Sequence, residues 1–174
     1  APRKSGRAPF SVGVPMQLDP TVLALLNRQI NAEQYAVSLY LAIGTWADAQ
    51  GFEGLSAWAL GESADEAAHA RKFLDYTNDR ASATLTAIAP PPVAFDDYAG
   101  ALQAALDAER AVSASLVELA SAALAAVDHA THQIAAGHIL AEQVPAEKLL
   151  AVALQRVARG APVDLLDAEL WEAA

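Results

Sequence analysis

Four glutamates and one histidine recur at wide, regular intervals along this chain of 174 residues. They are Glu33, Glu66, His69, Glu109 and Glu142, and the glutamates are separated by 33, 43 and 33 residues. Glu66 and His69 form a Glu-x-x-His pair, which places both side chains on one face of a helix. One acid from each of four helices, with an added imidazole, is a ligand set typical of two oxygen-activating metal ions.

A single glutamate on a helix is most simply explained as a solvent-exposed residue, because burying an unpaired carboxylate is costly. The four glutamates together point the other way. Each lies near the middle of a segment with a helical pattern, so antiparallel pairing of the segments would bring all four to one level. The spacing therefore predicts a buried dinuclear site for Fe²⁺, which accepts imidazole and carboxylate ligands.

The two halves of this predicted site differ. His69 follows Glu66 by three residues, whereas the residue three places after Glu142 is Pro145. Gln143 offers only a neutral amide. We therefore expect a tight first metal site and a weaker second one, and we expect Glu142 and Asp65 to face a third, auxiliary cation position.

Apolar residues at three- and four-residue steps predict the helices that position these side chains. The Asp19-Pro20 pair marks a helix start, with Asp as the N-cap and Pro in the first turn. The predicted long helices span about 20–48, 53–80, 96–125 with an Asp96 cap, and 128–159 before Gly160. Pro145 removes a backbone donor and should bend the last of them.

The segment 81–95 contains three consecutive prolines and cannot be a helix interior. Its length suits a crossover along the outside of a bundle. A short fifth helix is expected at about 163–172. The predicted fold is thus an all-α four-helix bundle of two hairpins, with a long crossover between the second and third helices and a short fifth helix at residues 163–172.

Composition narrows the function classes. The chain is 54% hydrophobic, carries a net charge of −10 and contains no cysteine, which excludes disulfides, thiolate zinc sites and iron–sulfur clusters. Its acidity makes nucleic acid an unlikely partner and cations suitable ones. No long apolar run predicts a membrane span, so we expect a cytoplasmic location. Residues 1–18, rich in basic residues, proline and glycine, are predicted to be a flexible tail before the 19–174 domain.

Several segments resemble those of ferritins, most closely bacterial non-haem ferritins, across residues 19–172. The segments are Leu26–Tyr35, Gly51–Gly54, Asp65–His69, Ala108–Arg110 and Ala141–Val144. The resemblance implies a hollow shell of 24 identical subunits, oxidation of Fe²⁺ by O₂ or peroxide, and storage of ferric oxide. It implies the ferroxidase ligands Glu33, Glu66, His69, Glu109 and Gln143, with Glu142 beside them. Tyr40 matches a tyrosine next to the family's dinuclear iron centre, where it hydrogen-bonds a ligand or donates an electron.

Some features depart from neighbouring groups of the family. Pro145 stands where haem-binding bacterioferritins repeat the histidine, and the sole methionine, Met16, lies in the predicted tail, so no haem is expected. A diiron redox or peroxidase enzyme of the rubrerythrin-like type, without a mineral core, is the alternative, and a purely structural bundle is a third hypothesis. His129, His132 and His138 cluster at the start of the predicted fourth helix. They are interpreted as ordinary polar or interface positions, and the binding of passing metal ions is the alternative.

Overall fold

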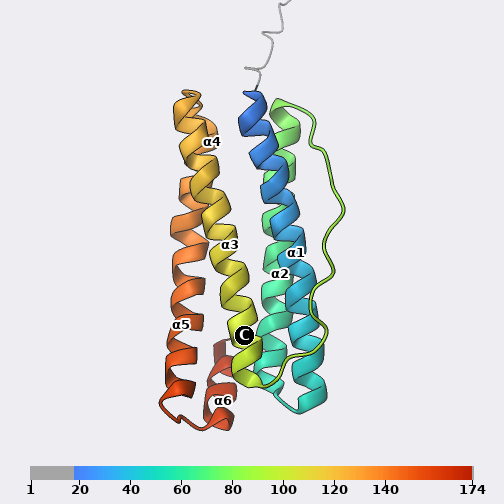
Figure 1. Cartoon of the computed structure of the whole chain (residues 1–174), viewed down its shortest axis with the longest axis vertical. Coiled ribbons are helices and arrows are strands. Elements are labelled where there is room, and N and C mark those ends of the chain that lie inside the picture. The colour runs from blue at the N-terminus through green and yellow to red at the C-terminus, as the bar shows by residue number, and fades with distance from the viewer. Residues whose placement is uncertain (1–17, 174) are drawn as a thin grey trace, which may run out of the picture.

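The computed structural model describes residues 18–173, and every regular element in that range is helical. The elements are α1 (Pro20–Gln50), α2 (Glu53–Arg80), α3 (Tyr98–Ala125), α4 (His129–His138), the π-helical turn η1 (Ile139–Gln143), α5 (Val144–Ala158) and α6 (Val163–Ala173). α4, η1 and α5 form one continuous rod, and Figure 1 shows it beside α1, α2 and α3, with α6 turned back at one end. The predicted all-α bundle with a short fifth helix is confirmed.

Local sequence explains where the helices begin and end. Asp19 accepts hydrogen bonds from the backbone N–H groups of Thr21 and Val22 at 2.8 and 3.4 Å, and Gly51 ends α1 with a φ of 81°. The predicted cap of the third helix was wrong by one residue. Asp97, not Asp96, accepts from the N–H of Gly100 at 2.7 Å and is the N-cap of α3, which begins at Tyr98.

The crossover between α2 and α3 runs as an extended segment along the length of the bundle, as predicted (Figure 1). Two asparagines of α1 fasten it. Asn27 Oδ1 accepts from the N–H of Thr84 at 2.9 Å, and Asn31 Nδ2 donates to Thr86 Oγ1 at 2.8 Å. The crossover is not helical, so its backbone groups need other hydrogen-bond partners, and Asn27 supplies one to the N–H of Thr84.

The apolar core consists of two clusters with a polar layer between them. The cluster towards the α4 end includes Leu26, Ile30 and Phe73, and the cluster towards the α6 end includes Leu39, Ile43, Leu55, Leu102 and Leu150. Burying each such side chain contributes roughly 1.5–3 kcal/mol. The two clusters supply the stability that allows the layer between them to be polar.

The predicted tail falls almost wholly on residues 1–17, which lie outside the described part of the chain. Leu18, the last residue assigned to that tail, is buried and packs with Val22 in the apolar cluster near α4. Among residues 18–173, no helix combines the length and apolar character that crossing a membrane requires.

The rod of α4, η1 and α5 departs from regular α-helix next to Pro145. The N–H of Val144 bonds to the carbonyl of Ile139, five residues back, which defines a π turn. The sequence predicted a bend caused by Pro145, and the structure has a π turn, which contains Glu142, just before that proline. The predicted end of the rod is confirmed, since Gly160 has a φ of 82° directly after it.

Candidate metal centre

The polar layer brings together one predicted ligand from each rod of the bundle. Glu33 lies on α1, Glu66 on α2, Glu109 on α3 and Gln143 on η1, and none of the four is more than 3% exposed. Three carboxylates in such a setting are costly unless a cation or proton compensates them.

Two carboxylate oxygens in this layer lack any hydrogen-bond partner among the described residues. Glu33 Oε1 accepts from Gln29 Nε2 at 2.7 Å, but Glu33 Oε2 has no donor. Glu109 Oε1 accepts from the Tyr40 hydroxyl, but Glu109 Oε2 has no donor. Buried polar atoms are nearly always paired, so two free carboxylate oxygens in one layer fit donors for a metal ion.

Glu33 and Glu66 behave as a pair that shares one proton. Burial, with the charge and hydrogen bond of Glu33 added, raises the pKa of Glu66 to about 11. Burial acts in the same direction on Glu33, but its interactions with His138, Glu66 and Gln29 outweigh it, so the pKa of Glu33 is lowered. A metal ion that enters this pair can replace the shared proton.

The Glu-x-x-His pair has the expected geometry. His69 Nδ1 lies 3.1 Å from Glu66 Oε2, three residues earlier on α2. Burial, followed by the neighbouring His138, lowers the pKa of His69. The imidazole is therefore neutral near pH 7 and has a lone pair available for a metal.

Tyr40 is fully buried, and its hydroxyl donates to Glu109. Burial and the charge of Glu109 raise the pKa of Tyr40 well above the usual phenol value, so the group stays protonated and remains a donor. Its ring packs edge-on against Trp58 with centroids 5.6 Å apart. One of the two roles expected of Tyr40, orienting a ligand residue through a hydrogen bond, therefore has its geometry here.

A cavity of about 210 Å³ leads to this layer from the side of α2 and η1. Its acidic and ligand-type lining is Glu62, Asp65, Glu66, His69, Glu109, Glu142 and Gln143. Asp65 is exposed at the mouth and Glu142 is half-buried, so the two residues expected at an auxiliary position do line one space. Glu62 joins them, and burial followed by Glu109 raises its pKa to about 7.

His138 is the residue that sequence reasoning placed wrongly. We interpreted it as a polar or interface position, but it is fully buried, and its Nε2 lies 3.5 Å from Glu33 Oε1. Its ring packs edge-on against His69 and Phe73, with centroids 4.5 and 5.2 Å away. His129 is exposed, and His132 is half-buried with its Nδ1 3.2 Å from the carbonyl of Ala120, which agrees with ordinary polar roles for those two.

The π turn explains why the position of His138 was missed. In an α-helix, residues four apart share a face, which would pair His138 with Glu142. The π turn inserts one extra residue, so that His138 and Gln143, five apart, both point inward and Glu142 is left half-buried. Gln29 and Glu62 carried a readable signal, since each lies four residues before a predicted ligand.

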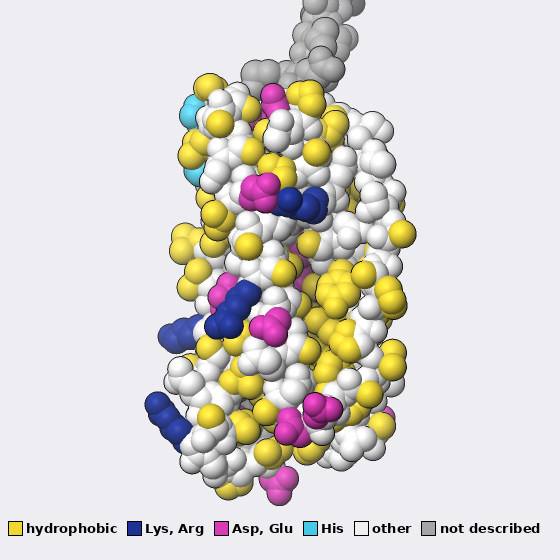
Figure 2. Space-filling view, in the orientation of Figure 1, with side chains coloured by type: hydrophobic (Ala, Val, Ile, Leu, Met, Phe, Trp, Pro, Cys, Tyr) yellow, Lys and Arg dark blue, Asp and Glu magenta, His cyan; other side chains and the backbone are white. Residues whose placement is uncertain are grey.

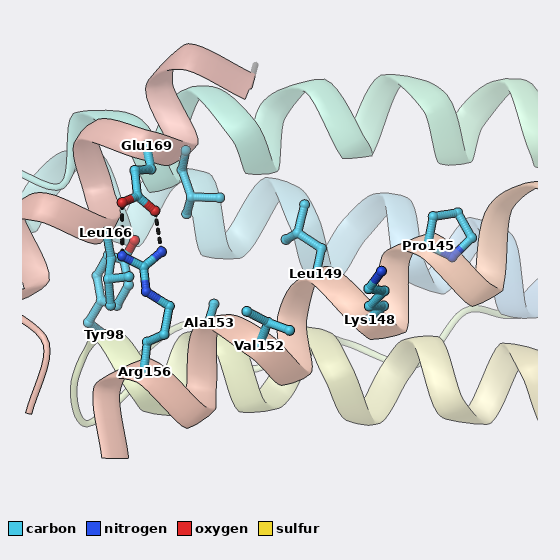
Figure 3. A pocket seen from close by; sticks show the side chains of 10 residues that line it. Tyr98, Pro145, Lys148, Leu149, Val152, Ala153, Arg156, Leu166 and Glu169 are labelled. Carbon is cyan, nitrogen blue, oxygen red and sulfur yellow. Dashed lines mark hydrogen bonds and ion pairs between the residues drawn. The ribbon is translucent and has the colours of Figure 1, made fainter. Parts of the chain in front are cut away.

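A larger cavity, of about 420 Å³, lies between α5 and α6 and is mostly apolar (Figure 3). Figure 3 shows Arg156 and Glu169 facing each other across it, and their second pair of atoms, Nη2 and Oε1, is 2.8 Å apart. Arg156 and Glu169 are thus paired with each other, unlike the glutamates of the polar layer. Pro145 and Leu149 line both cavities, so the two spaces adjoin.

Comparison with known proteins agrees with this geometry. A model of the ferritin-like domain matches residues 23–160, so the chain belongs to the ferritin family. It is 29% identical over 141 residues to a protein of Haemophilus influenzae named "Probable bacterial non-heme ferritin-like protein", covering 80% of this chain and 85% of that one. It is 31% identical over 115 residues to the bacterial non-heme ferritin of a Staphylococcus epidermidis strain, covering 66% and 69%.

Solved structures give the same assignment. An open pore ferritin from Archaeoglobus fulgidus superposes with a TM-score of 0.83 at 29% identity, covering 88% of this chain and 96% of that one. A structure described as a humanized archaeal ferritin gives a TM-score of 0.82 at 28% identity, covering 89% and 98%.

Proposed function

We propose that this chain is an iron-storage ferritin that oxidises Fe²⁺ to Fe³⁺ at a dinuclear site within each subunit. The observation that carries the proposal is the pair of buried carboxylate oxygens, one on Glu33 and one on Glu109, that have no hydrogen-bond partner among the described residues. Family membership adds support, because it makes iron the expected ion.

The ligand types suit that reaction. Carboxylates are hard, anionic donors that stabilise Fe³⁺ more than Fe²⁺, so they favour loss of an electron to O₂ or peroxide. We assign the first iron to Glu33, Glu66 and His69, and the second to Glu109 and Gln143, with Glu142 beside it. Ser113 Oγ lies 2.5 Å from Glu147 Oε1 and 3.1 Å from Gln143 Oε1, and these contacts restrain the amide. Asp65 and Glu142 serve an auxiliary cation position on the way in.

Storage requires a shell, and the surface of the subunit offers faces to build one. Figure 2 shows hydrophobic side chains gathered beside the crossover. A groove there is lined by Leu41, Ala42, Thr45, Trp46, Ala49 and Val93. Leu41 is 47% exposed and Val93 84%, which is typical of a surface that another subunit covers. We propose a homo-oligomeric shell of 24 subunits, in the cytoplasm, around a ferric oxide mineral.

Sizing after aerobic iron loading tests this function. Apo-protein receives Fe²⁺ in large excess over its ligand sites and passes through a sizing column with separate iron and protein detection. Iron that elutes with a particle of about 430 kDa, from 24 chains of 18.1 kDa, supports storage in a closed shell. Iron that never stays with the protein contradicts it.

A diiron redox enzyme on an organic or peroxide substrate is the second candidate. The specific observation in its favour is the apolar cavity of about 420 Å³ that adjoins the metal layer, since a space of that size accepts a small molecule. About two irons per chain on a small oligomer, with no mineral, would support this candidate instead.

A further inference from the structure

We propose that His138 is a direct metal ligand, so that one half of the dinuclear site holds its ion with two imidazoles, from His69 and His138, together with Glu33. This proposal deepens the function above and rests on it for the identity of the physiological ion. The site itself is a nitrogen-rich position for a divalent transition-metal cation such as Fe²⁺, Zn²⁺ or Co²⁺.

The ligand atoms of Glu33, His69 and His138 lie close enough together to share one ion. Glu33, His69 and His138 each offer one ligand atom within 4.8 Å of the others. Donors around a tetrahedral Zn²⁺ with bonds of about 2.0–2.1 Å lie roughly 3.4 Å apart. The 3.5 Å between His138 Nε2 and Glu33 Oε1 matches that spacing, and the His69 donor, which lies within 4.8 Å of the other two, would move closer on binding.

Within residues 18–173, His138 also lacks a hydrogen-bond partner for the nitrogen that faces Glu33. Its side chain is fully buried, and Nε2 has no hydrogen-bond partner among the described residues. The contact with Glu33 is at 3.5 Å, too long for a normal hydrogen bond. A buried imidazole nitrogen without a partner, beside a carboxylate whose Oε2 also has none, fits two ligands of a shared ion.

Packing fixes the imidazole ring of His138 before any ion binds. Phe73 and His69 hold it between two edge-on contacts, and the π turn directs it inward together with Gln143. A ligand held in this way loses little entropy on binding. The site therefore divides into a half with two imidazoles and a half with oxygen donors only, and imidazole donors favour Zn²⁺, Co²⁺ and Fe²⁺.

Lys72 lies on the other side of the His138 ring, beside Nδ1, and so provides a second test of the proposal. Its Nζ lies 3.3 Å from His138 Nδ1. A metal on Nε2 requires the proton to sit on Nδ1, which then faces an ammonium group that cannot accept it. Lys72 is exposed, so it can turn into solvent, but its charge opposes binding.

The test uses Zn²⁺ at half an equivalent per chain on the full-length apo-protein, so that the tightest site fills first. X-ray absorption at the zinc edge counts the imidazoles on the metal, and calorimetry gives the affinity. We expect two imidazoles in the wild type, one in His138→Gln, and an affinity at least about tenfold weaker in that variant. His132→Gln, on the same helix but outside the layer, should keep two imidazoles and the wild-type affinity.

Lys72→Gln provides a second measurement on a surface position. Its amide oxygen can accept from Nδ1–H, so zinc binding should tighten about threefold, the scale of one exposed charge. One imidazole in the wild type, or unchanged affinity in both His138→Gln and Lys72→Gln, overturns the proposal. Failure of the proposed function looks different, because zinc would then bind through two imidazoles while added Fe²⁺ stayed unoxidised.

Discussion

Two buried polar clusters lie in this bundle, and they are satisfied to very different degrees. Near the start of α4, Arg80 Nη1 donates to both carboxylate oxygens of Asp128 at 2.8 Å and to Thr131 Oγ1 at 2.9 Å, and Tyr76 completes the cluster with a 2.8 Å hydrogen bond to Thr131. In the central layer, by contrast, Glu33, Glu109 and His138 each retain an unpartnered atom.

The difference lies in charge as well as in hydrogen bonding. Arg80 and Asp128 cancel each other, whereas none of the three central glutamates has an ion pair with an arginine or lysine among the described residues. A cluster whose hydrogen bonds are all made rigidifies a fold. A cluster with unpartnered buried groups destabilises the metal-free protein, and a bound cation offsets that desolvation free energy. Changes in the first cluster should therefore affect folding, and changes in the second should affect chemistry.

The largest expected effect follows from removing ligands in the central layer. Glu33→Ala combined with His69→Ala should slow the rapid oxidation of Fe²⁺ by at least about 100-fold, because the first iron loses two donors. Stopped-flow absorbance after mixing with aerobic Fe²⁺ measures the rate. Helical content and assembly should stay as in the wild type, since neither apolar cluster is touched.

The matched control for that experiment is Asp107→Ala, two residues from Glu109 on the exposed side of α3. It should oxidise iron at the wild-type rate. If the double variant also oxidises iron at that rate, the assignment of the centre is wrong.

Arg80→Ala should give the reverse result. Removing the guanidinium leaves the Asp128 carboxylate, whose side chain is only 7% exposed, without its cation, and should lower the free energy of unfolding by about 2 kcal/mol. Urea unfolding followed by circular dichroism measures this loss. Iron oxidation should be unchanged in the folded protein. Arg71→Ala, which breaks an exposed pair with Asp75 on the same helix, should leave stability as it is.

Low pH should remove the stabilisation that the charge of Asp128 gives to its cluster. Burial works against ionisation of Asp128, but hydrogen bonds from Arg80 and Thr131 prevail and lower its pKa below the usual 3.8. A depressed folded-state pKa means that the stabilisation is complete above about pH 4 and is lost as pH falls through the folded value. Asp128→Asn, which retains an N-cap residue, should be about 1.5 kcal/mol less stable than the wild type at pH 7.

The measurement is the gap in free energy of unfolding between wild type and Asp128→Asn from pH 7 to pH 2. The gap should be flat down to about pH 4 and narrow below it. A gap that stays constant through pH 2 would show that charge on Asp128 contributes nothing to folding.

The contrast between the clusters also separates what sequence reasoning captures from what it does not. Helical periodicity, the Asp19-Pro20 start and Gly160 located the rods, because each is a local effect of a few residues. The registry of Glu33, Glu66 and Glu109 was readable because antiparallel rods of similar length align their midpoints.

The position of His138 depended on something periodicity does not contain. One π turn shifts the phase of every later residue on the rod, and the α-helical spacing assumed for residues 128–159 gave no sign of it. The cap of α3 shows the same limit on a smaller scale, since two consecutive aspartates are equivalent in sequence and only the path of the crossover selects Asp97.

The smallest expected effect concerns one of the hydrogen bonds that satisfy part of the central layer, the bond between Tyr40 and Glu109. Tyr40→Phe removes the donor to Glu109 Oε1 and leaves that carboxylate without its hydroxyl partner. The metal-free protein should lose about 1 kcal/mol of stability, and Tyr35→Phe on the same helix should lose less, since Tyr35 is only half-buried. Oxidation should slow by less than tenfold if Tyr40 only orients Glu109. A transient tyrosyl signal in electron paramagnetic resonance of the wild type, absent from Tyr40→Phe, would assign it the electron-donor role instead. Unchanged stability and rate in Tyr40→Phe would mean that Glu109 needs no orienting partner. The hydrogen bond from Tyr40 would then contribute nothing to the central layer.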